Sequence, residues 1–151
     1  MTFHSFRSTK DEVARAAFPQ AKFGHVGISF GKSKKIIGFG PRLKPGEKVA
    51  FGKSFKGKLT NDTAIFNGLE ELGVSVNQHV VQLTRGQYYK ARFRLAIDRG
   101  LSSLGLLRKR YAFPRKVAPH FDADCFNCAT YPVSLGFETP FPSGILSQYL
   151  K

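Results

Sequence analysis

Apolar and polar positions alternate most regularly in the segment "GHVGISFGKSKKIIGFGP", residues 24–41. The alternation runs through His25, Val26, Gly27, Ile28, Ser29 and Phe30. A period of two predicts a strand with one buried face. Residues 31–34 then supply a turn, and "KKIIGFG", which Pro41 ends, reads as the returning strand. We therefore expect a β-hairpin here.

A helical period replaces this alternation in residues 61–73. Asn61 or Asp62 is placed to cap the start of the helix, and Gly73 stands where a C-terminal cap belongs. The expected apolar face consists of Ile65, Phe66, Leu69 and Leu72.

A strand over residues 74–83 and a second helix follow. Thr84 and Gln87 have the spacing of a capping box, and Gly100 is expected to end this helix. Its predicted apolar stripe comprises Tyr88, Ala91 and Leu95, with Tyr89, Phe93 and Ala96.

The remaining segments carry weaker patterns. Residues 1–22 are expected to be a loosely packed lead-in with a short helix over residues 11–18, which Pro19 stops. Residues 42–59 are expected to form a loop with a short strand at "KVAF", and residues 101–124 read as irregular. The order of elements predicts an α+β fold, with one domain over residues 23–151.

Composition adds a strong charge to this picture. Lys and Arg number 24 against 10 Asp and Glu, a formal net charge of +14. Such a field favours nucleic acid, anionic lipid, cell-wall polymer or an acidic partner, without choosing among them. No apolar run approaches ~18 residues, so no membrane span is expected. The charged N-terminal sequence does not indicate ordinary secretion.

Both cysteines lie in "DADCFNCATYPVSLG", residues 122–136. A disulfide between Cys125 and Cys128 would close a very tight loop, and a redox pair normally lies near the start of a βαβ unit. Zinc is a sharper alternative, because His120, Cys125 and Cys128 are close in sequence and His25 or His79 could complete the ligand set. Two buried, inert thiols are a further alternative.

The last alternative is a nucleophilic thiol, which needs a base nearby. Of the four histidines, His4 falls in the expected lead-in and His120 on a proline-flanked loop. His25 begins a predicted strand between glycines, a rigid platform for a base that must stay within ~3 Å of a sulfur. The residues alone leave these alternatives open.

Taken in order, "GHVGIS", "LTRGQYYKARFRLA" and "FNCATYPVSLGF" resemble the circularly permuted papain-like superfamily. That group includes permuted NlpC-type and lecithin:retinol acyltransferase-like enzymes. The segments "GFGP", "NDTAIFNGLEELG", "NCATYP" and "PFPSGILSQYL" are most similar to effector or toxin domains of bacterial polymorphic and type VI secretion systems. The resemblance covers roughly residues 23–150.

This resemblance implies a permuted papain-like fold, a small antiparallel sheet packed against helices. It makes Cys128 the nucleophile and His25 the general base, with Asn127 shaping the turn. No cofactor or metal is implied, and Cys125 has no role. Relatives usually orient the histidine with a polar residue on the next strand, but "KKIIGFGP" offers none. The orienting group is then a backbone carbonyl or a side chain from elsewhere, the candidates being Asp122, Asp124, His79 and Gln82.

A second departure concerns the helix that commonly starts at the nucleophile. Pro132 follows Cys128 by four residues, so a regular helix from Cys128 would clash, and the helix is expected to start later or to be distorted.

The expected function is that of a bacterial effector or toxin. It would act as a thiol hydrolase on an amide bond of a peptide, of peptidoglycan or of a protein side chain. A phospholipid acyl hydrolase or acyltransferase on the same scaffold is the alternative. The non-enzymatic alternative is a basic nucleic-acid-binding module, although the sequence contains no recognisable motif for specific nucleic-acid binding. The resemblance implies synthesis in the bacterial cytoplasm, delivery by a specialised secretion system, and an acidic immunity protein as partner.

Overall fold

The protein is described by a computed structural model that covers residues 1–50, 53–112 and 125–137, without the side chain of Cys125. A seven-stranded sheet has the order β5-β1-β2-β3-β4-β6-β7. Neighbouring strands are antiparallel except β6 and β7, which are parallel. The strands are β1 (Thr2–Phe6), β2 (His25–Ser29), β3 (Ile37–Pro41), β4 (Ser54–Asn61), β5 (Val76–Val80), β6 (Arg110–Ala112) and β7 (Cys125–Phe126). The expected α+β class, a small antiparallel sheet packed against helices, is confirmed.

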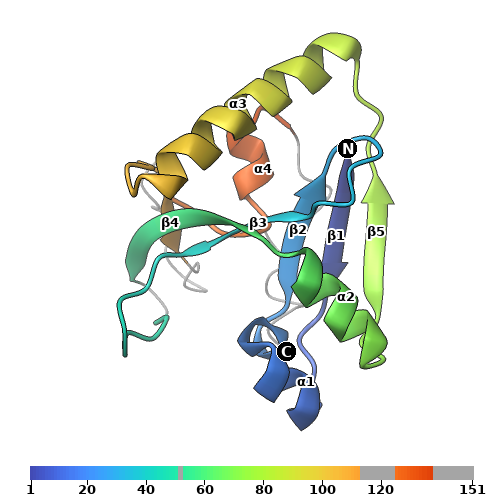
Figure 1. The fold of residues 1–151 in the computed structure, drawn as a ribbon, viewed down its shortest axis with the longest axis vertical. Coiled ribbons are helices and arrows are strands. Elements are labelled where there is room, and N and C mark those ends of the chain that lie inside the picture. The colour runs from blue at the N-terminus through green and yellow to red at the C-terminus, as the bar shows by residue number, and fades with distance from the viewer. Residues whose placement is uncertain (51–52, 113–124, 138–151) are drawn as a thin grey trace, which may run out of the picture.

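Helices cover both faces of this sheet (Figure 1). On one face, α1 (Glu12–Ala17), the 3-10 turn η1 (Pro19–Lys22) and α2 (Thr63–Glu71) enclose a core around Phe6, Phe66 and Leu69. On the other, α3 (Arg85–Ser103) and α4 (Tyr131–Ser134) enclose a larger core. No described helix is long and apolar enough to cross a membrane.

The expected hairpin is present, with Gly27 opposite Gly38 in the pairing of β2 with β3. The prediction of one buried face is wrong, because all five residues of β2 are buried. Strand β2 lies between β1 and β3, and Ser29 on its second face bonds its hydroxyl to His4 Nε2 at 2.8 Å. Both faces of β2 are therefore closed to solvent.

The N-terminal segment is not a loosely packed lead-in. Strand β1 lies between β2 and β5, and Phe3 and Phe6 are both 0% exposed. His4, expected in a frayed terminus, is buried. The short helix before Pro19 is present as α1, whose first turn is capped by the Asp11 carboxylate. Residues 2–6 thus belong to the same sheet as β2, so no boundary at residue 22 separates them from it.

Two other expectations need correction. The described part of "KVAF", residues 48–50, carries no strand; the strand of this region is β4, whose residues Phe55 and Gly57 are buried on either side of exposed Lys56. Helix α3 has the expected capping box of Thr84 and Gln87 but continues past Gly100 to Ser103. The segment "PFPSGILSQYL", residues 140–150, lies outside the described residues.

Candidate functional site

His25 is held at the first position of β2 by its neighbours in the chain and in the core. Gly24 directly before it has φ of 78°, and a Cβ there would come within 2.9 Å of the Phe6 carbonyl oxygen. Glycine is therefore required at this entry to the strand. The rings of Phe6 and Phe66 lie 6.1 and 5.9 Å from the imidazole, centroid to centroid. The imidazole therefore packs against both rings, whose own centroids lie 5.3 Å apart.

Cys128 lies on a turn that Asn127 organises. The Asn127 side-chain oxygen accepts hydrogen bonds from the backbone N–H groups of Ala129 and Thr130, each at 2.9 Å. The Asn127 backbone N–H in turn donates to the Thr130 hydroxyl at 2.9 Å. This reciprocal pair has the form of a capping box, and the expected turn-shaping position of Asn127 is observed. Helix α4 starts only at Tyr131, with Pro132 in its first turn, so the helix begins after Cys128 as expected.

Two contacts anchor this turn to the rest of the protein. The Tyr131 hydroxyl donates to the buried Asp98 carboxylate on α3 at 2.7 Å, and Lys109 forms an ion pair with the same carboxylate. The Tyr131 ring stacks on Phe39 of β3, with centroids 4.8 Å apart. Cys128 is thereby fixed between α3 and the sheet.

The structure brings Cys128 and His25 together and adds a third residue. The Cys128 thiol is hydrogen bonded to the His25 imidazole. Asp62 Oδ2 lies 2.7 Å from His25 Nε2, which leaves Nδ1 as the ring nitrogen for the thiol. Cys128, His25 and Asp62 are 6%, 9% and 3% exposed. A thiol, an imidazole and a carboxylate therefore form one buried chain of hydrogen bonds.

Asp62 takes the place of the orienting residue that the sequence left open. Asp122 and Asp124 lie outside the described residues, while His79 and Gln82 are exposed on or beyond the edge strand β5. Asp62 stands at the N-cap position of α2, as expected, but its carboxylate makes no capping bond and turns to His25 instead. Because either Asn61 or Asp62 could cap α2, the sequence offers one more capping side chain than the helix needs. That surplus is the signal that could have identified Asp62 as a site residue.

Gly38 is a further site residue that the sequence did not reveal. It lies on β3 opposite Gly27, two residues along β2 from His25. A Cβ at Gly38 would overlap the Asp62 carboxylate and come within 2.7 Å of His25 Nε2. The bond between His25 and Asp62 therefore occupies the space that a side chain at residue 38 would fill.

The electrostatics favour a thiolate–imidazolium pair. Burial alone lowers the pKa of His25, but the negative charge at Cys128 and hydrogen bonds to Asp62 and Cys128 outweigh it and raise this pKa to about 10. Burial alone raises the pKa of Cys128, but the His25 charge, its hydrogen bond and the backbone N–H groups of Val26 and Ala129 lower it. Burial also opposes ionisation of Asp62, and the His25 hydrogen bond and charge prevail and lower its pKa. Each group thus stabilises the charge on its neighbour.

A groove of about 510 Å³ opens beside this cluster. His25, Asp62 and Tyr111 line it together with apolar side chains that include Phe23 and Val49. Burial and the negative charge at Cys128 raise the pKa of the Tyr111 hydroxyl, so this hydroxyl stays protonated beside the sulfur. The groove gives an extended substrate a place next to the imidazole.

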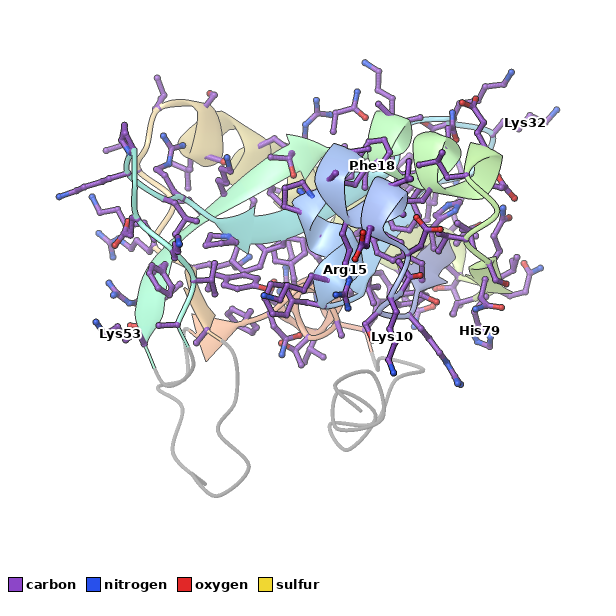
Figure 2. The ribbon with its side chains drawn as sticks, turned by 90° about the horizontal axis from the view of Figure 1, so that it is seen from below. Lys10, Arg15, Phe18, Lys32, Lys53 and His79 are labelled. Atoms are coloured by element: carbon purple, nitrogen blue, oxygen red, sulfur yellow. The ribbon has the colours of Figure 1, made fainter. Side chains whose placement is uncertain are left out.

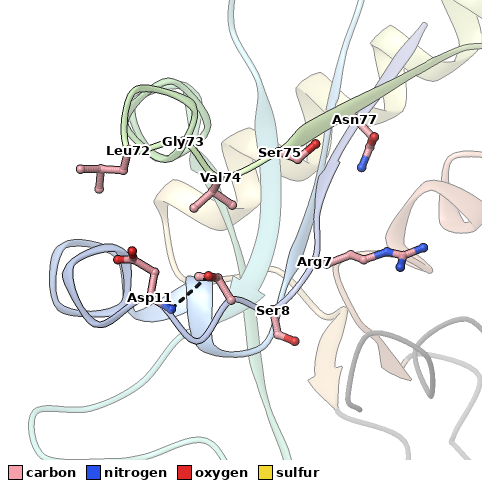
Figure 3. A pocket seen from close by; sticks show the side chains of 9 residues that line it. Arg7, Ser8, Asp11, Leu72, Gly73, Val74, Ser75 and Asn77 are labelled. Atoms are coloured by element: carbon pink, nitrogen blue, oxygen red, sulfur yellow. Dashed lines mark hydrogen bonds between the residues drawn. The ribbon is translucent and has the colours of Figure 1, made fainter.

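A different pocket, of about 550 Å³, lies between the segment after β1 and the turn that joins α2 to β5 (Figure 3). Arg7, Ser8, Asp11 and Asn77 are among its lining residues, and the Asp11 backbone N–H bonds the Thr9 hydroxyl at 3.1 Å. None of Cys128, His25 and Asp62 lines it. It holds no thiol or imidazole for the chemistry considered above.

The rival interpretations of the cysteines can be compared with this geometry. Cys128 is a free thiol. Within the described residues, no three His, Cys, Asp or Glu side chains are arranged to hold a metal ion. His120 and the Cys125 side chain lie outside that part of the chain, and His79 is exposed on β5. The Cys128 thiol and the His25 imidazole are already hydrogen bonded to each other.

Comparison of the chain with protein-family models, with curated proteins and with solved structures found no match.

Proposed function

We propose that this protein is a thiol hydrolase in which Cys128 is the nucleophile, His25 the general base and acid, and Asp62 the residue that orients His25. The observation that carries the proposal is the buried hydrogen-bonded chain from Cys128 through His25 to Asp62. A catalytic thiol needs an adjacent base that a third group orients, and these three side chains meet that requirement.

The reaction follows from the positions of the protons. The Cys128 thiolate attacks the carbonyl carbon of an amide, and the electron pair of the carbonyl moves to its oxygen. The His25 imidazolium then gives its proton to the amide nitrogen, the C–N bond breaks, and an amine leaves a thioester on Cys128. Water, deprotonated by His25, attacks the thioester; the carboxylic acid departs and the thiolate–imidazolium pair is restored.

Tyr111 is our candidate donor to the oxyanion. Its hydroxyl stays protonated in the field of the thiolate and lines the groove beside His25. A donor already in place where negative charge develops lowers the barrier without reorganisation. Tyr111→Phe removes only this hydroxyl, and the loss of one oxyanion donor typically costs about 10²–10³ in rate.

An amide is our preferred substrate bond because an amine leaves only after it is protonated. His25, with its pKa raised to about 10, remains an imidazolium at neutral pH and can supply that proton. The apolar lining of the groove would equally accept an acyl chain, so hydrolysis of a lipid ester is the second candidate. In either case the resemblance suggests a bacterial effector delivered into a target cell.

The proposal is tested with p-nitrophenyl acetate, which needs no knowledge of the natural substrate. We expect a burst of p-nitrophenolate and an acetyl group on Cys128, located by mass spectrometry. The burst should vanish in Cys128→Ala and slow strongly in His25→Ala, while Cys125→Ala retains it. Acetylation confined to Cys125, or an undiminished burst in folded Cys128→Ala, would refute the assignment.

The substrate bond needs a second experiment. Production of the protein in bacteria should be toxic, and Cys128→Ala should abolish that toxicity at equal protein levels. Release of new amines from peptidoglycan or protein supports the amide; release of lysolipid from vesicles supports the ester. Full toxicity of Cys128→Ala would contradict both.

A further inference from the structure

A second groove, of about 330 Å³, lies between α3 and the connection from β2 to β3. Its lining includes four cationic side chains, those of Lys32, Lys35, Arg92 and Arg99, and no Asp or Glu. It shares no residue with the groove beside His25. Four like charges around one hollow repel one another, and an anion placed there relieves that repulsion.

The floor of this groove is apolar. Buried Ile28, Phe30 and Leu95 line it beneath the cations. The Tyr88 ring packs edge-on against Phe30, its hydroxyl accepts a bond from Arg92 at 3.1 Å, and the Arg92 guanidinium lies over the same ring. The groove therefore suits a ligand that is anionic at one end and apolar at the other.

The adjacent surface of α3 is also apolar and exposed. Tyr89, Phe93 and Ile97 follow one another at four-residue spacing, so they form one line along the helix. They are 57%, 68% and 46% exposed, and Leu104 beyond them is 72% exposed. Tyr89 contacts Tyr88 of the groove at 5.6 Å between ring centroids, which makes the two features continuous.

The charges on α3 flank this apolar line. Arg92 and Arg99, seven residues apart, lie on the side of the groove, and exposed Lys90 lies on the other side. Asp98, the acidic residue of this helix, is buried. A helix face with aromatic and aliphatic residues bordered by cations is typical of peptides that lie in a membrane interface.

We propose that this surface, which we call the α3 face and define by Lys32, Lys35, Tyr89, Arg92, Phe93, Ile97 and Arg99, binds the surface of an anionic phospholipid bilayer. A lipid phosphate occupies the groove, and Phe93 and Ile97 enter the boundary of the acyl chains. Nucleic acid fits less well, because the aliphatic Ile97 and Leu104 cannot stack on bases as aromatic rings do. The inference concerns binding and does not depend on the proposed catalysis.

The test is sedimentation of the full chain with vesicles of equal parts phosphatidylglycerol and phosphatidylcholine, against vesicles of phosphatidylcholine alone. We expect binding to the first and little to the second at ~100 mM salt. Lys32→Gln/Arg99→Gln removes two charges from the α3 face and should weaken binding about 30-fold, given the usual contribution of a basic residue at an anionic surface.

The matched control is Lys10→Gln/Lys53→Gln, which removes the same charge from exposed sites. Figure 2 shows Lys10 and Lys53 well apart from Lys32. The control should lose less than about 3-fold, because distant exposed charges are largely screened. Equal losses in both double variants, in proteins with unchanged melting temperature, would show a diffuse charge effect and overturn the proposal.

Phe93→Asn separates a lipid surface from other phosphates. It leaves the net charge unchanged and should weaken vesicle binding about 10-fold through the lost apolar burial. No effect of Phe93→Asn, release of the bound protein by millimolar inorganic phosphate, or tighter binding to a single-stranded oligonucleotide would each overturn the membrane assignment.

Discussion

Asp62→Asn is the most informative single change in the candidate site. It removes the negative charge that lies 2.7 Å from His25 Nε2 while preserving the shape of the side chain and one oxygen acceptor. The imidazolium loses its charged partner, so its proton is held less tightly. The imidazolium beside Cys128 is then less stable and less firmly oriented, so it stabilises the thiolate less well and the pKa of Cys128 should rise.

The size of the effect follows from the type of bond that is lost. A hydrogen bond to a charged group contributes about 1.5–3 kcal/mol, against ~1 kcal/mol for a neutral bond. The difference, about 0.5–2 kcal/mol, corresponds to roughly 0.4–1.5 pKa units, since one unit is 1.36 kcal/mol. We expect the pKa of His25 to fall from about 10 by this amount, and the pKa of Cys128 to rise by a smaller amount, because Asp62 acts on the sulfur through His25.

The assay is site-resolved alkylation of Cys128 with iodoacetamide across pH 5–9, read by mass spectrometry so that Cys125 is counted separately. The pH midpoint is independent of how accessible the buried sulfur is, because access scales all rates alike. NMR titration of the His25 ring protons gives the partner pKa directly. Asp11→Asn is the matched control, since it makes the same charge change at the cap of α1.

Two results would refute the reasoning. An alkylation midpoint of the wild-type Cys128 near the ordinary thiol value of ~8.5 would exclude a stabilised thiolate. An Asp62→Asn midpoint within ~0.3 units of the wild type, in a folded protein, would show that a charge of this size is not felt at the sulfur.

Two further predictions concern the elements that support the site. Gly38→Ala should lower stability by about 1–3 kcal/mol and raise the alkylation midpoint of Cys128, because the new methyl group overlaps the Asp62 carboxylate. The control is Gly100→Ala, whose new methyl group meets no atom within 4 Å and should neither lower stability nor raise that midpoint. Equal melting temperatures for the two variants would contradict the close approach. Phe3→Ala should cost about 3–5 kcal/mol, seen as a fall in melting temperature of roughly 10 °C, whereas exposed Val13→Ala should change little. An unchanged melting temperature in Phe3→Ala would instead support a loosely packed N-terminal segment.

Local patterns predicted local elements well. The hairpin of β2 and β3, the capping box of α3 and the α2 helix with Gly73 at its end all depend on residues close in sequence. The sequence does not predict β1 as a strand, because the polar residues His4 and Ser5 lie among its buried positions. The His4 imidazole and the Ser29 hydroxyl form a hydrogen bond between β1 and β2. Only the register of the two strands reveals this pairing.

The pattern also misassigned residues that the period alone cannot place. Tyr88, Ala91 and Leu95 lie on the core side of α3, but Tyr89, Phe93 and Ala96, which the pattern places in the same stripe, are exposed. The sequence predicts a loop at β4 because Lys56 and Lys58 alternate with Phe55 and Gly57, and glycine contributes little apolar signal. Such positions are decided by tertiary packing.

The same contrast between local sequence pattern and tertiary packing applies to the candidate site. Cys128 and His25 are candidates from the sequence because it holds only two cysteines and four histidines, and the resemblance selects one of each. Asp62 could not, because a carboxylate before a helix is first explained as a cap. Only the approach of β3 and β4 to β2 places it beside His25, and only the absence of a side chain at Gly38 leaves room for it.

The proposed activation of Cys128 therefore depends on the sheet more than on a helix. Helix α4 has four residues and starts after the sulfur, so its dipole can contribute little. Strand β2 instead reaches the sulfur twice, through the His25 ring and through the Val26 backbone N–H. Tyr131, stacked on Phe39 of β3 and bonded to Asp98 of α3, holds the turn against that strand. Loosening of this packing should thus lower thiolate reactivity before the protein unfolds, because the two donors that β2 supplies to the sulfur depend on it.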